Sequence, residues 1–334
     1  MEGGRYRTDT VTSPFSFLRG ASSAEELFAQ AALYGIEALG IVDRNSLAGI
    51  VRAHEAAKAT GVRLVVGCRL DLADGTAVLA YPTDRPAYAR LCRLLTLGKG
   101  RAGKGRCRLK WADLAAYADG LIAILIPDLA DAACGLRLRE AFGDSAYLAL
   151  TLRRRPNDQL RLHELANLAT PMRVATVVTN DVLFHAPGRR ILQDVVTCIR
   201  HKVTIDELGF RRERHADRYL KPPKEMHRLF SCYPEALERT LEITERCRFS
   251  LTELAYQYPE EAALCPPPSP RPSPKTAILH QRPNQCLRLA RHLGLANDLP
   301  AAIHHAHAAP FQRDVDPGIV LHGRPSMMLG AGRT

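Results

Sequence analysis

The feature that most constrains the fold of this chain is a regular alternation of short apolar stretches with amphipathic helical ones. The apolar stretches predict buried strands at Glu37–Val42, Val62–Val66, Gly120–Pro127, Ala146–Leu152 and Arg173–Asp181. Strands that are apolar along their whole length are typical of a mostly parallel sheet covered by helices. The predicted fold class is therefore α/β, and with about seven strands both a closed or distorted barrel and an open sheet fit the pattern.

The stretches between these strands have helical periodicity. Ser22 and Ser23, followed by Glu25 and Glu26, predict a capping box, and Gly35 predicts the end of that helix. Further helices are expected at Ser46–Thr60, Arg85–Leu97, Lys110–Ala118, Leu129–Phe142 and Asn157–Ala169. Asp74 and Gly75 between two apolar runs predict a hairpin turn.

The character of the sequence changes twice after Asp181. Up to Ser250 it is helical with few strand signals, whereas after Glu261 it contains no glutamate and half of the 22 prolines of the chain. This predicts a barrel domain at residues 1–200, a helical connector at 201–261 and a tail at 262–334. The tail is interpreted either as a disordered, proline-rich segment or as the product of a shifted reading frame.

The charge of the chain indicates the class of its partners, and its cysteines indicate its cellular location. The 46 Lys and Arg against 35 Asp and Glu give a net charge of +11, which favours an anionic partner such as nucleic acid, although arginine used for solubility gives the same balance. Nine scattered cysteines without a CxxC pair indicate reduced thiols and a cytoplasmic location. No apolar run reaches the length of a membrane span, so no membrane partner is expected.

Several stretches in order along the chain resemble one protein family. Residues 15–72, beginning FSFLRGASSAEELF and ending VRLVVGCRLDL, resemble the N-terminal PHP domain of bacterial C-family (DnaE-type) DNA polymerases. Tyr81–Leu109 and Thr179–Phe210 resemble the error-prone, translesion branch of that family. Leu220–Glu261 is similar to the segment that connects this domain to the polymerase palm. The resemblance covers Tyr6–Glu261 and implies a PHP-like distorted (β/α)7 barrel.

The resemblance also implies a function for the complete family enzyme. That enzyme is a DNA-directed DNA polymerase in DNA repair, which uses dNTPs and Mg²⁺ held by palm carboxylates and works with a sliding clamp and mutasome accessory proteins. The tail of this chain has only Asp298, Asp314 and Asp316 as acids. We therefore expect a fragment without the palm centre, with no catalytic residue, no cofactor of its own, and weak, non-specific attraction to DNA.

Metal-binding PHP domains place His and Asp/Glu ligands at the ends of their strands, and the resemblance shows what stands there in this chain. Arginine cannot bind a cation, and threonine is a poor ligand without anionic partners. Only Asp43 and Asp181 remain as acids, so we expect a scaffold that has lost its metals. The positions concerned are Thr10-Val11-Thr12 for His-x-His, Asp43-Arg44 for Asp-His, Gly67-Cys68-Arg69 for Gly-x-Glu, and Asn180-Asp181-Val182-Leu183 for Asn-Asp-x-His, with His185 offset by two.

Acidic side chains remain beside positions at which arginine stands in place of a family ligand. This suggests that ion pairs replace the metal contacts. We expect Asp43 to pair with Arg44 or Arg69, and Asp181 to pair with a basic neighbour.

Two basic runs and a histidine cluster are the remaining candidates. The glycine-rich run Gly98–Lys110 is interpreted either as a loop that contacts phosphates or as a solvated surface loop. Arg211–Lys224 is expected to be an exposed connector, and His304, His305 and His307 imitate a metal cluster without supporting acids. The possible phosphate contacts in the first run are Lys99, Arg101, Lys104, Arg106 and Arg108.

Two alternative functions stay open. One is a stand-alone, metal-dependent PHP phosphoesterase, and the other is a non-catalytic module that binds DNA or protein.

Overall fold

A computed structural model of the chain describes residues 8–127, 132–213 and 215–254. Seven strands form one sheet in the order in which they occur in the sequence. They are β1 (Thr8–Val11), β2 (Ala38–Arg44), β3 (Arg63–Asp71), β4 (Ala77–Pro82), β5 (Leu121–Ile126), β6 (Ala146–Thr151) and β7 (Ala175–Thr179). All pairings are parallel except those of β4, which runs antiparallel to both β3 and β5.

The turn that reverses the chain before β4 lies where the sequence predicts it. Gly75 has φ +91°, a left-handed conformation that glycine adopts without a steric penalty. Its neighbour Asp74 accepts a hydrogen bond from the Thr76 N–H at 3.0 Å. The mostly parallel sheet and the hairpin are thus both confirmed.

The sheet closes on itself at one point. Val11 in β1 forms a parallel bridge with Val182, just beyond β7. The Thr12 N–H donates to the Val182 carbonyl at 3.0 Å, and the Val182 N–H donates to the Thr10 carbonyl at 2.9 Å. This bridge joins β1 to the segment directly after β7, so the described strands form a distorted seven-stranded barrel.

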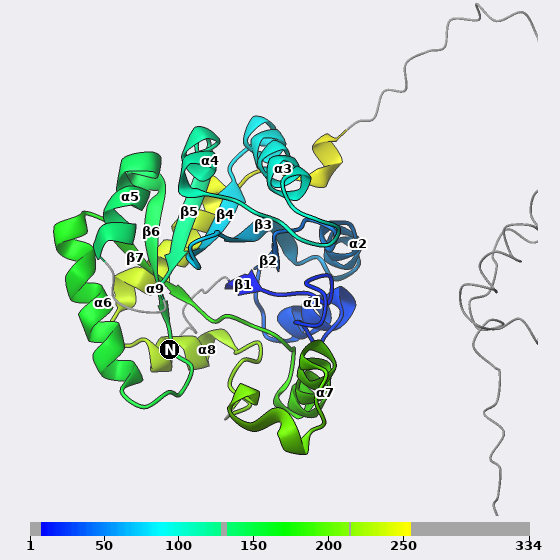
Figure 1. Cartoon of the computed structure of the whole chain (residues 1–334). Helices are drawn as coiled ribbons and strands as arrows, with labels where there is room; N and C mark the ends of the chain where they lie inside the picture. Colours follow the sequence, from blue (N-terminus) through cyan, green and yellow to red (C-terminus); the bar gives the residue numbers. More distant parts are fainter. Residues whose placement is uncertain (1–7, 128–131, 214, 255–334) are drawn as a thin grey trace, which may run out of the picture. The chain divides into compact units, whose positions relative to one another are not determined.

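Helices surround the strands, as Figure 1 shows for α1 to α6. Ser23 forms the N-cap of the first helix with Glu26 in a capping box, as predicted. Pro171 lies within the last turn of α6, which runs three residues past the predicted end. The helices are α1 (Ala24–Leu33), α2 (Ile50–Thr60), α3 (Arg85–Gly100), α4 (Trp111–Ala116), α5 (Ala132–Phe142), α6 (Asp158–Met172), α7 (Arg190–His201), α8 (Pro223–Leu229) and α9 (Pro234–Arg246).

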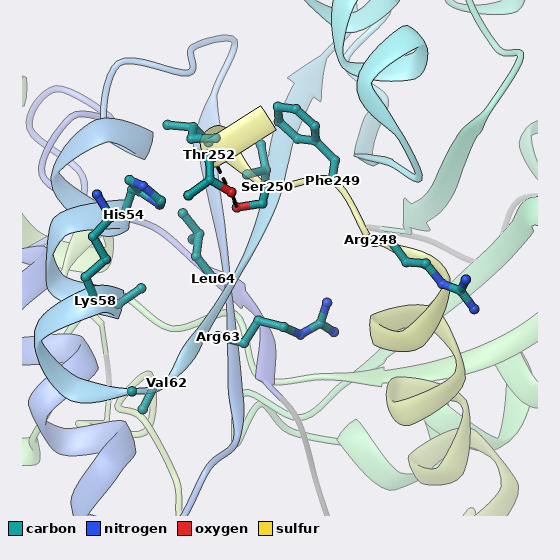
Figure 2. Close-up of a pocket in the computed structure, with 13 residues that line it drawn as sticks. His54, Lys58, Val62, Arg63, Leu64, Arg248, Phe249, Ser250 and Thr252 are labelled. Carbon is teal, nitrogen blue, oxygen red and sulfur yellow. Dashed lines mark hydrogen bonds between the residues drawn. The ribbon is translucent and has the colours of Figure 1, made fainter. Parts of the chain in front are cut away.

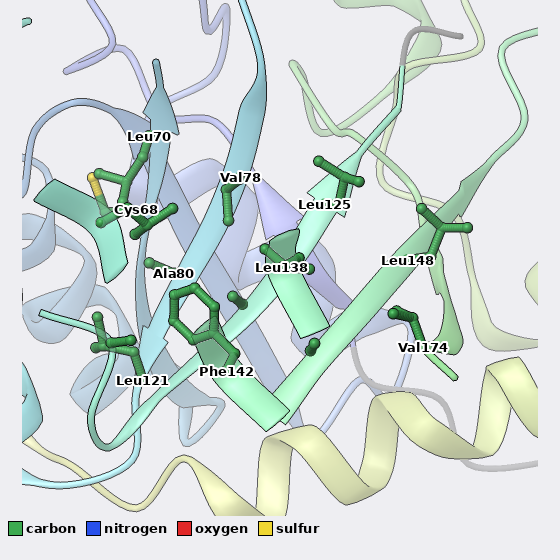
Figure 3. Packing of buried hydrophobic residues seen from close by; sticks show 14 of the residues in the cluster. Cys68, Leu70, Val78, Ala80, Leu121, Leu125, Leu138, Phe142, Leu148 and Val174 are labelled. Carbon is green, nitrogen blue, oxygen red and sulfur yellow. The ribbon is translucent and has the colours of Figure 1, made fainter. Parts of the chain in front are cut away.

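The largest apolar cluster lies between the sheet and its outer helices. Figure 3 shows Leu138 and Phe142 of α5 facing Ala80, Leu125 and other strand residues. These side chains are almost fully removed from water, which is the main favourable contribution to the stability of such a layer.

A second apolar cluster fills the barrel interior and includes residues at the end of α9 and directly after it. Ile243 and Cys247 pack with Tyr81 and Ile122 from the strands. Arg63, the first residue of β3, donates to the Cys247 carbonyl at 2.9 Å. Figure 1 shows α9 across the centre of the ring of strands, so this helix covers the end at which the parallel strands begin.

The predicted connector therefore packs on the barrel in the described part of the chain. Contacts group the described residues into one compact unit. The predicted boundaries at residues 200 and 261 stay predictions, and the predicted tail with its histidine cluster lies outside the described residues. No helix of the described residues is long and apolar enough to cross a bilayer.

Candidate functional site at the barrel mouth

The carboxyl ends of all strands except β4 lie at the same end of the barrel, which we call the mouth. This is the end at which barrel enzymes hold their catalytic groups. Asp43 and Arg69 reach it from β2 and β3, and Arg153 and Asp181 follow β6 and β7. Asp43, Arg69 and Asp181, which were singled out from the sequence, thus lie at the same end of the barrel, together with Arg153, which was not.

Asp43 is fully buried and is bound by serines. Its carboxylate accepts hydrogen bonds from the Ser13 N–H at 3.0 Å, the Ser13 hydroxyl at 2.7 Å and the Ser16 hydroxyl at 2.7 Å. Burial raises the pKa of Asp43, and the serine hydrogen bonds act in the opposite direction.

The predicted pairing of Asp43 with Arg44 or Arg69 is wrong. Both arginines bind Asp71 instead, each at 2.8 Å. The physical reason is that the serine donors already satisfy Asp43, while Asp71 at the end of β3 is partly exposed and reachable from both side chains. Asp71 is a site residue that the sequence reasoning missed, although its position at a strand end was a usable signal.

Asp181 forms the ion pairs that were predicted for it. Its carboxylate binds Arg153, and it accepts from Arg218 at 2.7 Å. Burial alone would raise the pKa of Asp181, but the guanidinium groups of Arg218 and Arg153 hold it well below its usual range. Asp181 is therefore a carboxylate at neutral pH, fully engaged by two cations.

The remaining family positions have structural contacts. The Thr10 hydroxyl accepts from the N–H groups of Asn180 at 3.1 Å and Asp181 at 3.0 Å. His185 binds the Ser22 hydroxyl through Nδ1 at 2.8 Å. Burial raises the pKa of the Cys68 thiol, and its Sγ donates to the Asp43 carbonyl at 3.3 Å.

These residues do not fit the metal site of a PHP phosphoesterase. Within residues 8–127, 132–213 and 215–254, no three His, Cys, Asp or Glu side chains form a group that could hold a metal ion. The two surviving acids have serine or arginine donors where a metal would need free lone pairs, and Arg69 would repel a cation. The residues at the mouth thus do not match the ligand set of a metal-dependent phosphoesterase.

The predicted phosphate-contact run begins in the last turn of α3, which contains Lys99, and continues as a mostly exposed loop. The structure brings Arg101 and Arg108 together with Lys110 around a hollow of about 320 Å³. Arg101 also pairs with Asp113. The loop is anchored by buried Leu109, while Lys99, Lys104 and Arg106 are exposed to solvent.

The predicted exposure of the connector Arg211–Lys224 is wrong for its second half. Asp217 and Lys221 are buried, and Lys221 Nζ donates to the Asn180 side chain at 2.9 Å. Arg218 binds Asp181. The charged side chains of this segment bind it to residues that follow β7. The sequence alone does not reveal these contacts.

A second hollow of about 370 Å³ lies between α2, the start of β3 and residues 248–252 (Figure 2). His54 and Lys58 face it from α2, and Phe249 and Thr252 line its other side. It lies at the end of β3 opposite to Arg69, and its lining contains no carboxylate or thiol. We therefore do not consider it a catalytic site.

Comparison with known proteins agrees with this geometry. Residues 10–154 match the PHP domain family. Error-prone DNA polymerase 2 of Rhizobium meliloti is 71% identical over 263 residues, which are 78% of this chain and 24% of that protein. An error-prone DNA polymerase of Rhodopseudomonas palustris is 43% identical over 332 residues, covering 96% of this chain and 28% of that protein.

A solved structure of an amidohydrolase from Chromobacterium violaceum covers 53% of this chain and 87% of its own, with 14% identity and a TM-score of 0.42. This likeness is too weak to bear on function.

Residues 10–154 thus form a PHP domain. The chain is a homologue of error-prone DNA polymerases, and the match is consistent with an N-terminal fragment of such a polymerase. It spans about a quarter of the length of these curated relatives.

Proposed function

We propose that residues 8–254 are a non-catalytic, structural module of an error-prone DNA polymerase. Template-directed synthesis from dNTPs with Mg²⁺, and contacts with a sliding clamp and mutasome accessory proteins, belong in this proposal to the whole polymerase. The module adds stability and weak attraction to DNA. We also propose a cytoplasmic location, which the thiol state of the described cysteines supports.

The observation that supports this proposal most directly is the state of the two surviving acids at the mouth. Asp43 accepts three hydrogen bonds from Ser13 and Ser16, and Asp181 is bound by two arginines. A metal-dependent hydrolase needs such carboxylates as ligands. Here they hold the barrel ends together.

An exposed apolar face on α7 supports docking on a larger protein. Ile191, Val195 and Ile199 are spaced by four residues and are 73%, 43% and 57% exposed. Residues at this spacing share one face of a helix, and apolar faces of this kind are typical of interaction sites. Because the relatives are about four times as long as the matched region, we assign this face to the remaining part of the polymerase.

One set of assays tests the catalytic side of the proposal. The purified chain is incubated with primed template, dNTPs and Mg²⁺, and separately with p-nitrophenyl phosphate and Mn²⁺. We expect no primer extension, and hydrolysis no greater than that of Asp43→Ala. Turnover that disappears in Asp43→Ala would favour the stand-alone phosphoesterase.

A second experiment tests docking. The chain is mixed with the remaining part of the Rhizobium meliloti polymerase and analysed by size-exclusion chromatography. We expect a complex that Val195→Glu weakens and that Leu136→Glu, a similarly exposed apolar position on α5, leaves intact. Absence of a complex, or self-association of the chain through α7, contradicts this assignment.

A further inference from the structure

Arginines gather at the mouth in excess over the acids that face them. Three carboxylates lie among these arginines. Asp43 is not counted with them, because its carboxylate accepts hydrogen bonds from Ser13 and Ser16. The arginines are Arg19, Arg44, Arg69, Arg153, Arg200 and Arg218. The facing acids are Asp71, Asp181 and Glu213.

These side chains come from separate elements but share one electrostatic environment. Arg44 and Arg69 are paired in register on β2 and β3 and share Asp71. The charge of Arg69 also acts on Asp181, across the barrel mouth. Arg200 of α7 donates to the Leu18 carbonyl at 3.0 Å, next to Arg19.

Many donors of this group are unused within the described part of the chain. Arg19 is half-buried and forms no hydrogen bond or ion pair with the residues described. Arg44 and Arg69 each use one N–H group, on Asp71, of the five that a guanidinium has. Arg153 Nε is buried and has no acceptor there. The unused nitrogen atoms of Arg19, Arg44 and Arg69 are not among the buried atoms without a partner, so these side chains can donate to an acceptor from solution.

The repulsion between neighbouring arginines at the mouth also favours the binding of an anion. Burial, followed by the charge of Arg69, lowers the pKa of Arg44 to about 10. Burial and the charge of Arg200 also lower the pKa of Arg19. Like charges that oppose one another in this way are stabilised by an anion placed between them.

We propose that the barrel mouth binds a phosphate-type anion directly through the guanidinium groups of Arg19, Arg44 and Arg69. A guanidinium offers paired donors that match two oxygens of a phosphate, and such charge-assisted hydrogen bonds are stronger than neutral ones. The site goes beyond the structural role proposed above and does not depend on it. The phosphate could belong to a free inorganic anion or to the end of a nucleic acid strand.

Titration calorimetry of the whole chain with inorganic phosphate and with pyrophosphate, in the presence of EDTA, tests the site. We expect saturable binding to the native chain at ligand concentrations up to about 10 mM. Arg19→Ala should bind about tenfold more weakly, the loss expected for one charge-assisted contact. Its melting temperature should stay close to that of the native chain, because Arg19 has no ion pair with the described residues to lose.

The matched control is Arg93→Ala, which removes an equally charged but exposed side chain from α3. It should bind both anions as the native chain does. No saturable binding, or equal weakening in Arg93→Ala and Arg19→Ala, would overturn the proposal.

Two oligonucleotides that differ only in a 5′-phosphate separate the two sources of the anion. Tighter binding of the phosphorylated strand, lost in Arg19→Ala, supports the site with a nucleic acid end as its ligand. If both strands bind equally and pyrophosphate binding still depends on Arg19, the result supports the site with a free anion as its ligand.

Discussion

Asp181 is the residue at which charge and stability are most closely coupled. Its pKa in the folded chain lies below the unfolded value of about 3.9. A carboxyl group with a depressed folded pKa contributes stability that is fully present above the unfolded pKa and is lost as pH falls through the folded pKa. The contribution of Asp181 should therefore be complete at neutral pH and decline below about pH 4.

Asp181→Asn should lower the free energy of unfolding by about 3 kcal/mol at pH 7, because Arg153 and Arg218 lose the charge that balances them. Urea unfolding at pH 7 and pH 3 measures this, and the difference from the native chain should be smaller at pH 3. Asp144→Asn, at a solvent-exposed ion pair with Arg139, is the control and should change little. A native–variant difference that stays constant with pH would contradict the explanation.

Sequence reasoning could identify both surviving acids but only part of their surroundings. Asp43 and Asp181 stood out because carboxylates remained at positions where the other family ligands had changed. Their actual partners could not be read from the sequence: Arg153 and Arg218 lie 28 and 37 residues from Asp181, on loops whose course depends on the whole fold. The resemblance to the PHP family indicated which residues lie at the mouth, and tertiary structure decided which of them touch.

Among the elements, α2 begins later in the sequence than predicted, and the structure shows why. The sequence predicts a helix from Ser46, but α2 begins at Ile50. Asn45 has φ +48°, and its side chain accepts from the Asp71 N–H at 3.1 Å. Gly49 lies so close to the mouth that an added Cβ would be 2.4 Å from Asp43 Oδ2. Contacts with the strand ends, rather than helix propensity, thus set the start of α2.

Gly49→Ala should consequently destabilise the chain by about 2 kcal/mol, because the new methyl group would displace the buried Asp43 carboxylate from its serine donors. Chemical unfolding followed by circular dichroism measures the change. Gly100→Ala at the end of α3 is a matched control, since its Cβ would meet nothing within 4 Å. It should be neutral or stabilising by up to about 1 kcal/mol. Equal effects of the two substitutions would show that close packing at Gly49 is unimportant.

For the molecule as a whole, the order of the elements was predictable and the closing contacts were not. Apolar periodicity is a local signal, so the strands after β1, the Asp74-Gly75 hairpin and the mostly parallel sheet followed from it. The bridge between Val11 and Val182, and the packing of Ile243 into the barrel, join segments far apart in sequence. No local pattern indicates such contacts.

The distribution of charge leads to a prediction at this same scale. The net charge of +11 attracts DNA non-specifically, but exposed cations at the end of α3 and in the loop after it should contribute more than isolated ones because they can approach a strand together. Replacing Lys99, Lys104 and Arg106 with Gln should weaken binding to single-stranded DNA. It should also reduce the slope of log K against log salt concentration by about 2, the change expected for three lost phosphate contacts.

The control replaces Arg52, Arg93 and Arg137, three exposed arginines on α2, α3 and α5, with Gln. Fluorescence anisotropy across a salt series compares the two triple variants, which have the same net charge. If the loop is a DNA contact, the loop variant alone shows the smaller slope, because only cations that touch phosphates release counterions on binding. If both variants lose affinity equally, net charge accounts for the attraction and the loop is only a solvated surface segment.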